Sequence, residues 1–443
     1  MPTRVLVVGS GGREHALAWK LAGEPGVNEV VVAPGSDAIA AEPRVRCVQV
    51  DPLDGPALVA CTRRDAIELA VIGPEAPLAA GVADSLVAAG VPTFGPTAAA
   101  ARIESSKAFC REVAEAAGVR MARGRSFDDL DAARAFAAEL APSGGIVIKA
   151  DGLAAGKGVT VCAHRDEAEA ALNDLFRDEG AGTRVVVEER LDGREASLIA
   201  LSDGHDVLAL APARDHKRLG DGDRGPNTGG MGAYSPLPDL PADVAARLLE
   251  TIHRPILAEL ARRGTPFVGA LYAGLMLTAD GPILLECNAR FGDPETQVLL
   301  PRLGTALGPL LLAAAQGDLR RASRTARLHD GMLPVADGAA VGVVLAAASY
   351  PGTPRRGDAI DGLDAAAATG ALVFHAGTTR DAAGAWRTNG GRVLTIVGRG
   401  TDLAAARAVA ERAADTVAWS GMQRRGDIAA VLPTEPVGSG SVR

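Results

Sequence analysis

The sequence predicts a multidomain protein of mixed α/β and α+β class that begins with a parallel sheet. The chain has 443 residues, which is enough for roughly three domains, each with its own core. Within the first hundred residues, short β-branched runs alternate with alanine-rich helical segments, a pattern typical of parallel sheets covered by helices. Beyond an arginine-rich polar break at residues 320–330, further strand-like runs and a helix at residues 403–417 predict a last, smaller mixed domain.

The first domain is predicted to contain four strands, at residues 5–8, 29–32, 69–72 and 91–94. Ligands of parallel sheets bind beyond the carboxyl ends of the strands. The residues that follow the predicted strands include Gly11, Pro34, Glu75 and Gly95. We therefore predict a substrate-binding α/β domain over residues 1–104.

A glycine-rich turn joins the first strand to a helix and continues as Gly12, Arg13, Glu14 and His15. Backbone N–H groups at such a helix start favour an anion. The turn resembles a dinucleotide fingerprint, but Glu14 stands where the third glycine is needed. The residues favour a phosphate or charged substrate over a nicotinamide cofactor, and a purely structural turn is the remaining alternative.

A lysine-bearing strand and loop dominate the middle of the chain. The apolar run at residues 146–148 ends in Lys149, and the following loop from Gly152 through Gly156 to Gly158 carries Lys157. Small residues let backbone N–H groups approach an anion, although the run is not a Walker A sequence. A flexible hairpin with a solvated lysine is the alternative.

Lysine is rare in this chain, which makes these positions informative. Only five of the 46 basic residues are lysine, and the others are arginine. Since an ammonium is a compact charge that a guanidinium does not replace, the remaining lysines are candidates for function. Lys107, which opens a predicted helix, belongs to the same group.

Two further strands end in polar residues that suit nucleotide and metal binding. The strand at residues 184–187 runs into Glu188 and Glu189. Strands 269–277 and 282–290 are predicted to pair, which places Glu286, Asn288 and Arg290 on one face. One or two such oxygen ligands suit Mg²⁺ when phosphate oxygens complete its shell. A solvent-facing strand edge is the alternative.

The segment 220–236 is so rich in glycine that we expect neither helix nor strand, but an ordered binding loop. The last domain is predicted to contain strands at residues 340–347, 371–374 and 393–397.

Composition narrows the function classes. A net charge of −8 and 3% aromatic residues argue against a nucleic-acid partner. No apolar run is long enough to predict a membrane span. Five scattered cysteines, without metal-type spacing, indicate reduced thiols and a cytoplasmic location.

Taken together, several motifs resemble the phosphoribosylamine–glycine ligase family of the ATP-grasp superfamily. They are Gly73-Pro-Glu-Ala-Pro-Leu78, Ile148-Lys-Ala-Asp-Gly-Leu-Ala-Ala-Gly-Lys-Gly158, Asp215-His-Lys-Arg218, Gly225-Pro-Asn-Thr-Gly-Gly-Met-Gly-Ala-Tyr-Ser-Pro236, Arg290-Phe-Gly-Asp-Pro-Glu-Thr-Gln297, His375-Ala-Gly-Thr378 and Thr388-Asn-Gly-Gly-Arg392. The resemblance implies a monomer that joins glycine to 5-phosphoribosylamine with ATP and Mg²⁺ or Mn²⁺ in purine synthesis. It also implies an ATP-grasp domain over residues 105–325, with a mobile lid at about 123–191, and a C-terminal domain over residues 326–443.

The resemblance also assigns roles to residues. Lys107 and Lys149 are expected at the ATP phosphates, and the Gly152–Gly158 loop with Lys157 is expected over the transferring phosphoryl group. Glu188, Glu189 and Leu191 are expected at the adenine, Glu195 near the ribose, and Glu286 and Asn288 at the metal ion. The residues expected to face glycine and phosphoribosylamine are Gly12, Arg13, Glu14, His15, Glu75, Asp215, His216, Lys217, Gly229, Gly230, Met231, Gly232, Arg290, Asp293 and Glu295, with catalysis by Lys157, Arg290 and Asp215.

The chain departs from the family pattern at Ser36, Arg190 and the pair Ala348-Ser349, none of which removes a phosphate or metal contact. Another ATP-grasp ligase, acting on a different carboxylate and amine, is the alternative enzyme. A catalytically silent nucleotide-binding regulator is the alternative from another class.

Overall fold

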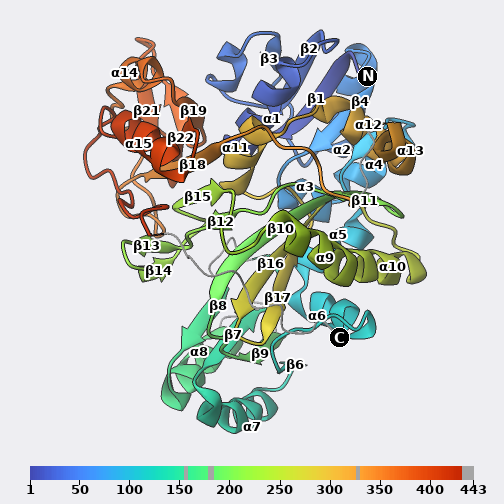
Figure 1. The fold of residues 1–443 in the computed structure, drawn as a ribbon, viewed down its shortest axis with the longest axis vertical. Helices are drawn as coiled ribbons and strands as arrows, with labels where there is room; N and C mark the ends of the chain where they lie inside the picture. Colours follow the sequence, from blue (N-terminus) through green and yellow to red (C-terminus); the bar gives the residue numbers. More distant parts are fainter. Residues whose placement is uncertain (154–157, 178–183, 326–329, 432–443) are drawn as a thin grey trace.

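The computed structural model describes residues 1–153, 158–177, 184–325 and 330–431. Its first domain, at the top of Figure 1, is a five-stranded parallel sheet of order β3-β2-β1-β4-β5 with helices packed on it. The strands are β1 (Arg4–Gly9), β2 (Glu29–Pro34), β3 (Val45–Cys47), β4 (Leu69–Ile72) and β5 (Thr93–Phe94). The helices are α1 (Gly12–Ala22), α2 (Gly55–Arg64), α3 (Glu75–Ala79), α4 (Val82–Ala88) and α5 (Ala98–Ser105). The predicted parallel sheet is confirmed, and its strands are buried because helices cover both faces.

A small antiparallel sheet lies at the opposite end of the molecule, in the lower part of Figure 1. Its order is β6-β9-β7-β8, and it has its own apolar core against two helices. This unit contains β6 (Gly124–Phe127), α7 (Leu130–Leu140), β7 (Ile146–Ala150), β8 (Val159–Cys162), α8 (Arg165–Arg177) and β9 (Val185–Glu189), and it follows α6 (Lys107–Ala116). The predicted lysine strand is therefore the central strand β7, paired with both β8 and β9.

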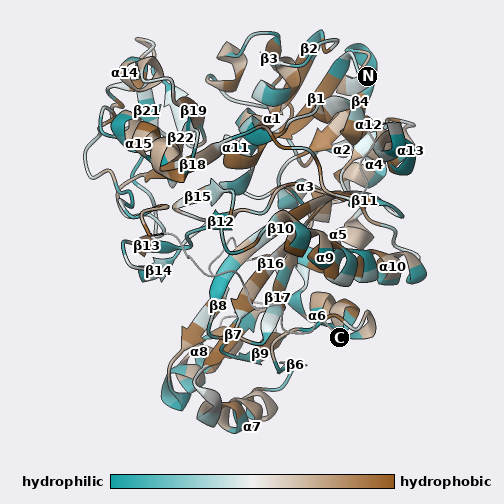
Figure 2. Ribbon diagram, in the orientation of Figure 1, coloured by the Kyte–Doolittle hydropathy of each residue, from teal (hydrophilic) through white to brown (hydrophobic). Residues whose placement is uncertain are grey.

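A four-stranded antiparallel sheet, β11-β10-β16-β17, forms the middle of the molecule. It comprises β10 (Arg194–Asp203), β11 (Val207–Ala209), β16 (Val268–Thr278) and β17 (Gly281–Asn288), with α9 (Ala242–Leu248), α10 (Arg254–Arg262), α11 (Glu295–Leu299), α12 (Leu307–Ala315) and α13 (Leu319–Thr325). Figure 2 shows hydrophobic colour along β10 and β16, whereas α9 and α13 carry hydrophilic stretches. The predicted pairing of the last two strands is confirmed, since Tyr272 lies opposite Asn288 and Gly274 opposite Glu286.

The last sheet, β12-β15-β18-β22-β19, combines distant parts of the chain. Its strands are β12 (Arg214–Asp215), β15 (Gly232–Ser235), β18 (Ala339–Ala346), β19 (Leu372–His375) and β22 (Arg392–Gly400), with α14 (Leu363–Ala368) and α15 (Leu403–Ala414). Two hairpins accompany it, β13 (Arg218–Gly220) with β14 (Arg224–Asn227), and β20 (Thr378–Arg380) with β21 (Trp386–Thr388).

Two sequence predictions of irregular structure are wrong. The segment 220–236 contains most of the β13–β14 hairpin and all of β15, because β15 pairs with β18 more than a hundred residues later. Such a partner leaves no local signal. Part of the arginine-rich break forms α13, whose first N–H group, at Leu319, bonds to the buried Asp203 carboxylate at 3.0 Å.

Candidate active site

A cavity of about 800 Å³ lies where the N-terminal domain, the central sheet, the last sheet and the small β6-β9-β7-β8 sheet meet. It receives side chains from helices of the N-terminal domain, from the β7–β9 unit, from the central sheet and from the last sheet. The predicted site residues that line it are Arg13, Glu75, Lys107, Lys149, Gly152, Gly158, Glu188, Glu189, Leu191, Glu195, Asp215, His216, Lys217, Gly229, Glu286, Asn288, Arg290, Asp293 and Glu295. Gly156 and Lys157 lie outside the described residues.

Two lysines form the wall beside the glycine loop. Lys149, at the end of β7, is nearly buried; its Nζ lies 2.6 Å from Glu188 Oε2 and donates to Leu285 O at 3.0 Å. Lys107, at the start of α6, donates to Gly152 O at 2.8 Å, and burial lowers its pKa. Both ammonium groups are thus fixed close to where the loop begins, as phosphate binding requires.

Glu188 has a different environment from the one expected at an adenine edge. Its carboxylate lies between Lys149 and Arg111, whose Nη2 is 3.0 Å away, and all three side chains are buried. Gly124 makes room for this arrangement, since a Cβ there would lie 2.6 Å from Glu188 Cγ. The carboxylate therefore neutralises and orients the lysine.

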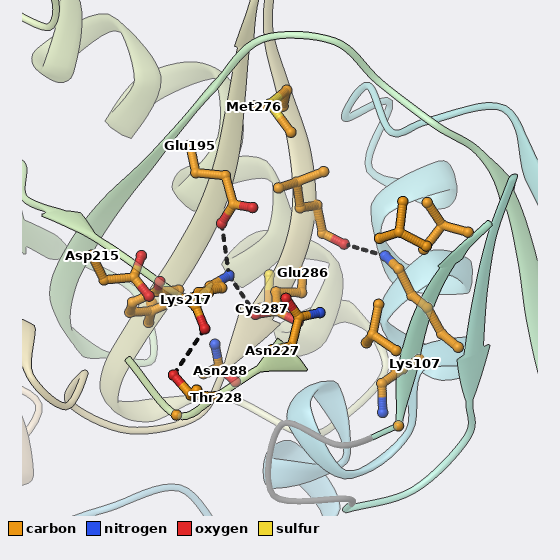
Figure 3. Close-up of a pocket in the computed structure, with 18 of the residues that line it drawn as sticks. Lys107, Glu195, Asp215, Lys217, Asn227, Thr228, Met276, Glu286, Cys287 and Asn288 are labelled. Atoms are coloured by element: carbon orange, nitrogen blue, oxygen red, sulfur yellow. Dashed lines mark hydrogen bonds and ion pairs between the residues drawn. The ribbon is translucent and has the colours of Figure 1, made fainter. Parts of the chain in front are cut away.

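A third lysine occupies the centre of the cavity (Figure 3). Lys217 Nζ lies 3.0 Å from Glu195 and 3.6 Å from Glu286, and it stands between these two carboxylates. Burial alone favours the neutral acid at Glu286, but Lys217, Lys149 and Lys107 hold the pKa of this carboxyl down to about 2. Glu286 is therefore ionised under all ordinary conditions.

The donor set at the end of β17 fits a hard divalent cation. Glu286 supplies an ionised carboxylate, and Asn288, two residues along the same strand, supplies an amide oxygen facing the same cavity. Gly274 opposite leaves space for the acid, since a Cβ there would lie 3.2 Å from Glu286 Cγ. Within the described ranges no cluster of three or more His, Cys, Asp or Glu side chains could hold a metal without other ligands. Any ion here needs further oxygens, such as those of phosphates.

A second acidic group lies on the other side of Lys217. Burial raises the pKa of Asp215 to about 8, while the Lys217 charge lowers this pKa and the charges of Glu295 and Glu195 raise it. Ser197 Oγ donates to Glu295 Oε1 at 3.0 Å and shares a 2.8 Å hydrogen bond with Tyr272. This end of the cavity can exchange a proton near neutral pH and accept cationic amines.

The first domain contributes Arg13 and Glu75 to the cavity wall, and the Glu75 carboxylate lies close to the Arg290 guanidinium. Arg290 Nε lies 3.2 Å from Glu75 Oε2, and Arg13 Nη2 lies 3.9 Å from the same oxygen. Burial opposes ionisation of Glu75, but the two guanidinium groups lower its pKa below the usual value.

Several predicted contacts lie behind the cavity wall instead of on it: Gly12, Glu14, His15, Gly230, Met231 and Gly232. Glu14 accepts from the Gly11 N–H group at 2.7 Å and packs against the glycine turns. His15 Nδ1 accepts the backbone N–H of His375 at 2.9 Å, which ties the first domain to the last sheet.

The sequence prediction missed many residues of the cavity wall, among them Glu104, Tyr272, and Tyr350 and Arg392 from the last domain. Arg392 Nη1 donates to Gly229 O at 2.5 Å and to Asp293 O at 2.6 Å, and Nη2 pairs with the Asp293 carboxylate at 3.0 Å. Tyr350 accepts the Gly229 N–H at 2.8 Å. The only signal for them was the turn that ends in Arg392, which resembles the family's last domain.

Comparison with known proteins gives a consistent result along the whole chain. Phosphoribosylglycinamide synthetase family models match in three parts: the N domain over residues 3–104, the ATP-grasp (A) domain over 105–296 and the C domain over 340–431. A phosphoribosylamine–glycine ligase of Neisseria meningitidis serogroup A is 48% identical over 96% of this chain and 98% of its own length. A trifunctional purine biosynthetic protein, adenosine-3, of Gallus gallus is 46% identical over 97% of this chain and 42% of its own length.

Solved structures agree with this assignment. The crystal structure of phosphoribosylamine–glycine ligase from Thermotoga maritima superposes with a TM-score of 0.79 at 33% identity, covering 96% of this chain and all of the other. The biotin carboxylase domain of a Hydrogenobacter thermophilus 2-oxoglutarate carboxylase, at 17% identity and a TM-score of 0.68 over 96% of this chain and 92% of the other, shares the fold alone. The chain therefore belongs to the phosphoribosylglycinamide synthetase, or phosphoribosylamine–glycine ligase, family.

Proposed function

We propose that the protein joins glycine to 5-phosphoribosylamine with ATP, giving glycinamide ribonucleotide, ADP and phosphate. The observation that carries this proposal is the single cavity in which phosphate-binding lysines, the Glu286–Asn288 pair and an acidic amine-binding end meet. The full-length similarity to ligases of this name supports the choice of substrates. We also infer that the protein acts as a monomer in the cytoplasm. The five free thiols support the cytoplasmic location.

ATP is proposed to bind along the β7 side of the cavity. Lys149 and Lys107 neutralise its phosphates, and the backbone at Gly152 and Gly158 approaches them closely. Glu189 and Leu191 border the adenine, and Glu195 lies towards the ribose. Lys157 is assigned to the transferring phosphoryl group by family resemblance alone, because it lies outside the described residues.

Glu286 and Asn288 are proposed to hold Mg²⁺ or Mn²⁺ together with phosphate oxygens. Such an ion, when bound, neutralises charge on the transferring phosphoryl group. The role of the protein's own residues is to keep the ligands ionised and in place, which Lys217 does for Glu286.

The proposed chemistry is activation of a carboxylate followed by attack of an amine. A carboxylate is a poor acylating agent, because its leaving group would be oxide. Transfer of the terminal phosphoryl group of ATP to the glycine carboxylate creates a good leaving group, and the amine of phosphoribosylamine then displaces phosphate from the glycyl phosphate. The protein needs only to position the groups and stabilise charge.

Arg290 and Asp215 are proposed to act on the reacting groups. The Arg290 guanidinium can stabilise negative charge on the acyl group. A carboxyl with a pKa of about 8, such as Asp215, can take up or return a proton as the amine reacts. Glu75, Asp293 and Glu295 complete the wall that faces glycine and phosphoribosylamine.

A matrix of substrate omissions tests the proposal. ADP formation is measured with glycine alone, with phosphoribosylamine alone and with both substrates together. The unstable amine is generated in the assay from ribose 5-phosphate and ammonia. We expect ADP and glycinamide ribonucleotide only with both substrates. Turnover with another small carboxylate in place of glycine would assign a different ligase, and ATP binding without any turnover would assign a regulator.

A further inference from the structure

The Arg290 guanidinium, in the cavity wall, lies between two acids, Glu104 and Glu75. Its Nη2 lies 3.0 Å from Glu104 Oε1, and the Glu104 side chain is only 7% exposed. On the other side, Nε approaches Glu75, whose side chain is 33% exposed, yet Nε makes no hydrogen bond within the described part of the chain. Both acids border the cavity, but they differ in exposure: Glu104 is nearly buried, whereas a third of the Glu75 side chain is exposed.

Glu104 holds the backbone as well as the guanidinium. Its second oxygen, Oε2, accepts the backbone N–H of Ala289 at 2.7 Å. Ala289 lies between Asn288, the candidate metal ligand, and Arg290. One carboxylate thus fixes the peptide that joins two functional residues and also the side chain of the second.

The position of Glu104 in the fold gives this contact its effect. It lies in the last turn of α5, at the end of the N-terminal domain, while Ala289 and Arg290 directly follow β17 of the central sheet. A nearly buried carboxylate that is ion-paired at one oxygen and hydrogen-bonded at the other is held in one geometry. The N-terminal domain can therefore set where the Arg290 guanidinium points.

We propose that Glu104 is a positioning residue for the ligase reaction, acting through Arg290 and the Asn288–Arg290 backbone. The inference rests on the proposed function, since it concerns the step in which Arg290 stabilises the acyl group. Without the Glu104 carboxylate, the guanidinium keeps its contacts to Glu75 and to Phe291 O, but Nη2 loses the contact that fixes its direction.

The test compares Glu104→Gln with Glu68→Gln. Glu68 is a matched control, because its two oxygens accept the N–H and hydroxyl of Thr3 at 2.7 and 2.8 Å, also in the N-terminal domain but away from the cavity. A glutamine at position 104 keeps the size but offers only one acceptor oxygen. Steady-state kinetics with ATP, glycine and phosphoribosylamine are recorded beside the thermal unfolding midpoint.

We expect Glu104→Gln to lower kcat by about tenfold to a hundredfold, as misplacement of a reacting group does, with the KM for ATP changed less than about twofold. Glu68→Gln is expected to keep the wild-type kcat. Glu104→Asp, which keeps the charge but is one methylene shorter, should fall between Glu104→Gln and the wild type, and it serves if the glutamine variant does not fold.

Three results would overturn the inference: a wild-type kcat in folded Glu104→Gln, a KM for ATP that rises as much as kcat falls, or an aspartate variant no better than glutamine. A wild-type protein that forms no glycinamide ribonucleotide would instead overturn the proposed function, so the two failures can be told apart.

Discussion

Three of the five lysines, Lys107, Lys149 and Lys217, stand in the wall of the cavity. Each has a short contact to an acid or a carbonyl oxygen, so each ammonium is held in place before a ligand arrives. Scarcity was therefore a useful signal: a chain that uses arginine on its surface keeps lysine where a compact, orientable charge is needed. Lys20, which donates to Leu303 O outside the cavity, shows that scarcity alone does not prove function.

At the proposed metal pair, replacement of Asn288 by leucine removes one proposed oxygen ligand while leaving the Glu286 charge. We expect the Mg²⁺ concentration for half-maximal activity to rise roughly tenfold, in the range that lost metal-site contacts cause. The exposed Asn28, changed to leucine in the same way, provides the control. An unchanged Mg²⁺ titration in Asn288→Leu would remove Asn288 from the metal site.

One buried histidine predicts a pH dependence of stability. Burial lowers the pKa of His253 from 6.5 to about 4, and its Nε2 lies 3.2 Å from Leu198 O. Between pH 6.5 and 4 the unfolded chain takes up a proton that the folded one does not, so this contribution is present above pH 6.5 and is lost as pH falls towards 4. The expected slope is about 1.4 kcal/mol per pH unit.

Unfolding free energies measured across this range check the prediction. His253→Gln should flatten the dependence by about one proton, whereas the same change at the exposed His205 should leave it as it is. Parallel curves for wild type and His253→Gln would show that His253 does not titrate in this way.

At the scale of elements, the sequence predicted best where local pattern and tertiary pairing agree. The β16–β17 hairpin was predicted with its polar face, because two strand-like runs lie on either side of a short segment that contains Asp280-Gly281. The segment 220–236 was wrongly predicted as a loop. Its strand β15 pairs with β18 of the last domain, and the local sequence gives no sign of that partner. The Glu188–Lys149–Arg111 group was equally invisible, since Arg111 lies 77 residues from Glu188.

A glycine in β6 tests that buried group. A Cβ at Gly124 would lie 2.6 Å from Glu188 Cγ and 2.7 Å from Arg111 Nη2, with backbone at 2.8 Å. We expect Gly124→Ala to cost about 1–3 kcal/mol of stability and to raise the KM for ATP, because Glu188 must shift from Lys149.

Gly220→Ala is the matched control, since Gly220 is also a strand glycine and its nearest contact would be an ordinary 3.4 Å. Its stability should stay within about 0.5 kcal/mol of wild type. An equal KM for ATP in Gly124→Ala and wild type would show that Glu188 does not orient the lysine.

At the scale of the molecule, one cavity collects side chains from helices of the N-terminal domain and from every described sheet except the N-terminal sheet and the β20–β21 hairpin. The sequence predicted the lysines and several of the carboxylates of the lining but placed no residue of the last domain there. Tyr350 and Arg392 act on Gly229 and Asp293 through contacts that only the assembled domains create. Among the residues that the structure describes, no helix is long and apolar enough to cross a bilayer.

The last domain's contribution is tested by Arg392→Lys. A single ammonium group cannot reach Gly229 O, Asp293 O and the Asp293 carboxylate together. We expect the KM for glycine or phosphoribosylamine to rise about tenfold with the KM for ATP unchanged, in keeping with the loss of one charged hydrogen bond. Arg399→Lys, at the exposed end of the same strand, should behave like wild type, and equal kinetics for the two variants would exclude the last domain from substrate binding.

We propose that glycine is activated as an acyl phosphate in this cavity, without a protein nucleophile. Glycine labelled with ¹⁸O in its carboxylate tests it most directly, with ATP, Mg²⁺ and phosphoribosylamine generated in place. We expect one labelled oxygen per turnover to appear in the released phosphate, because that oxygen leaves with the phosphoryl group when the amine attacks. Glycinamide ribonucleotide formed together with unlabelled phosphate would contradict it.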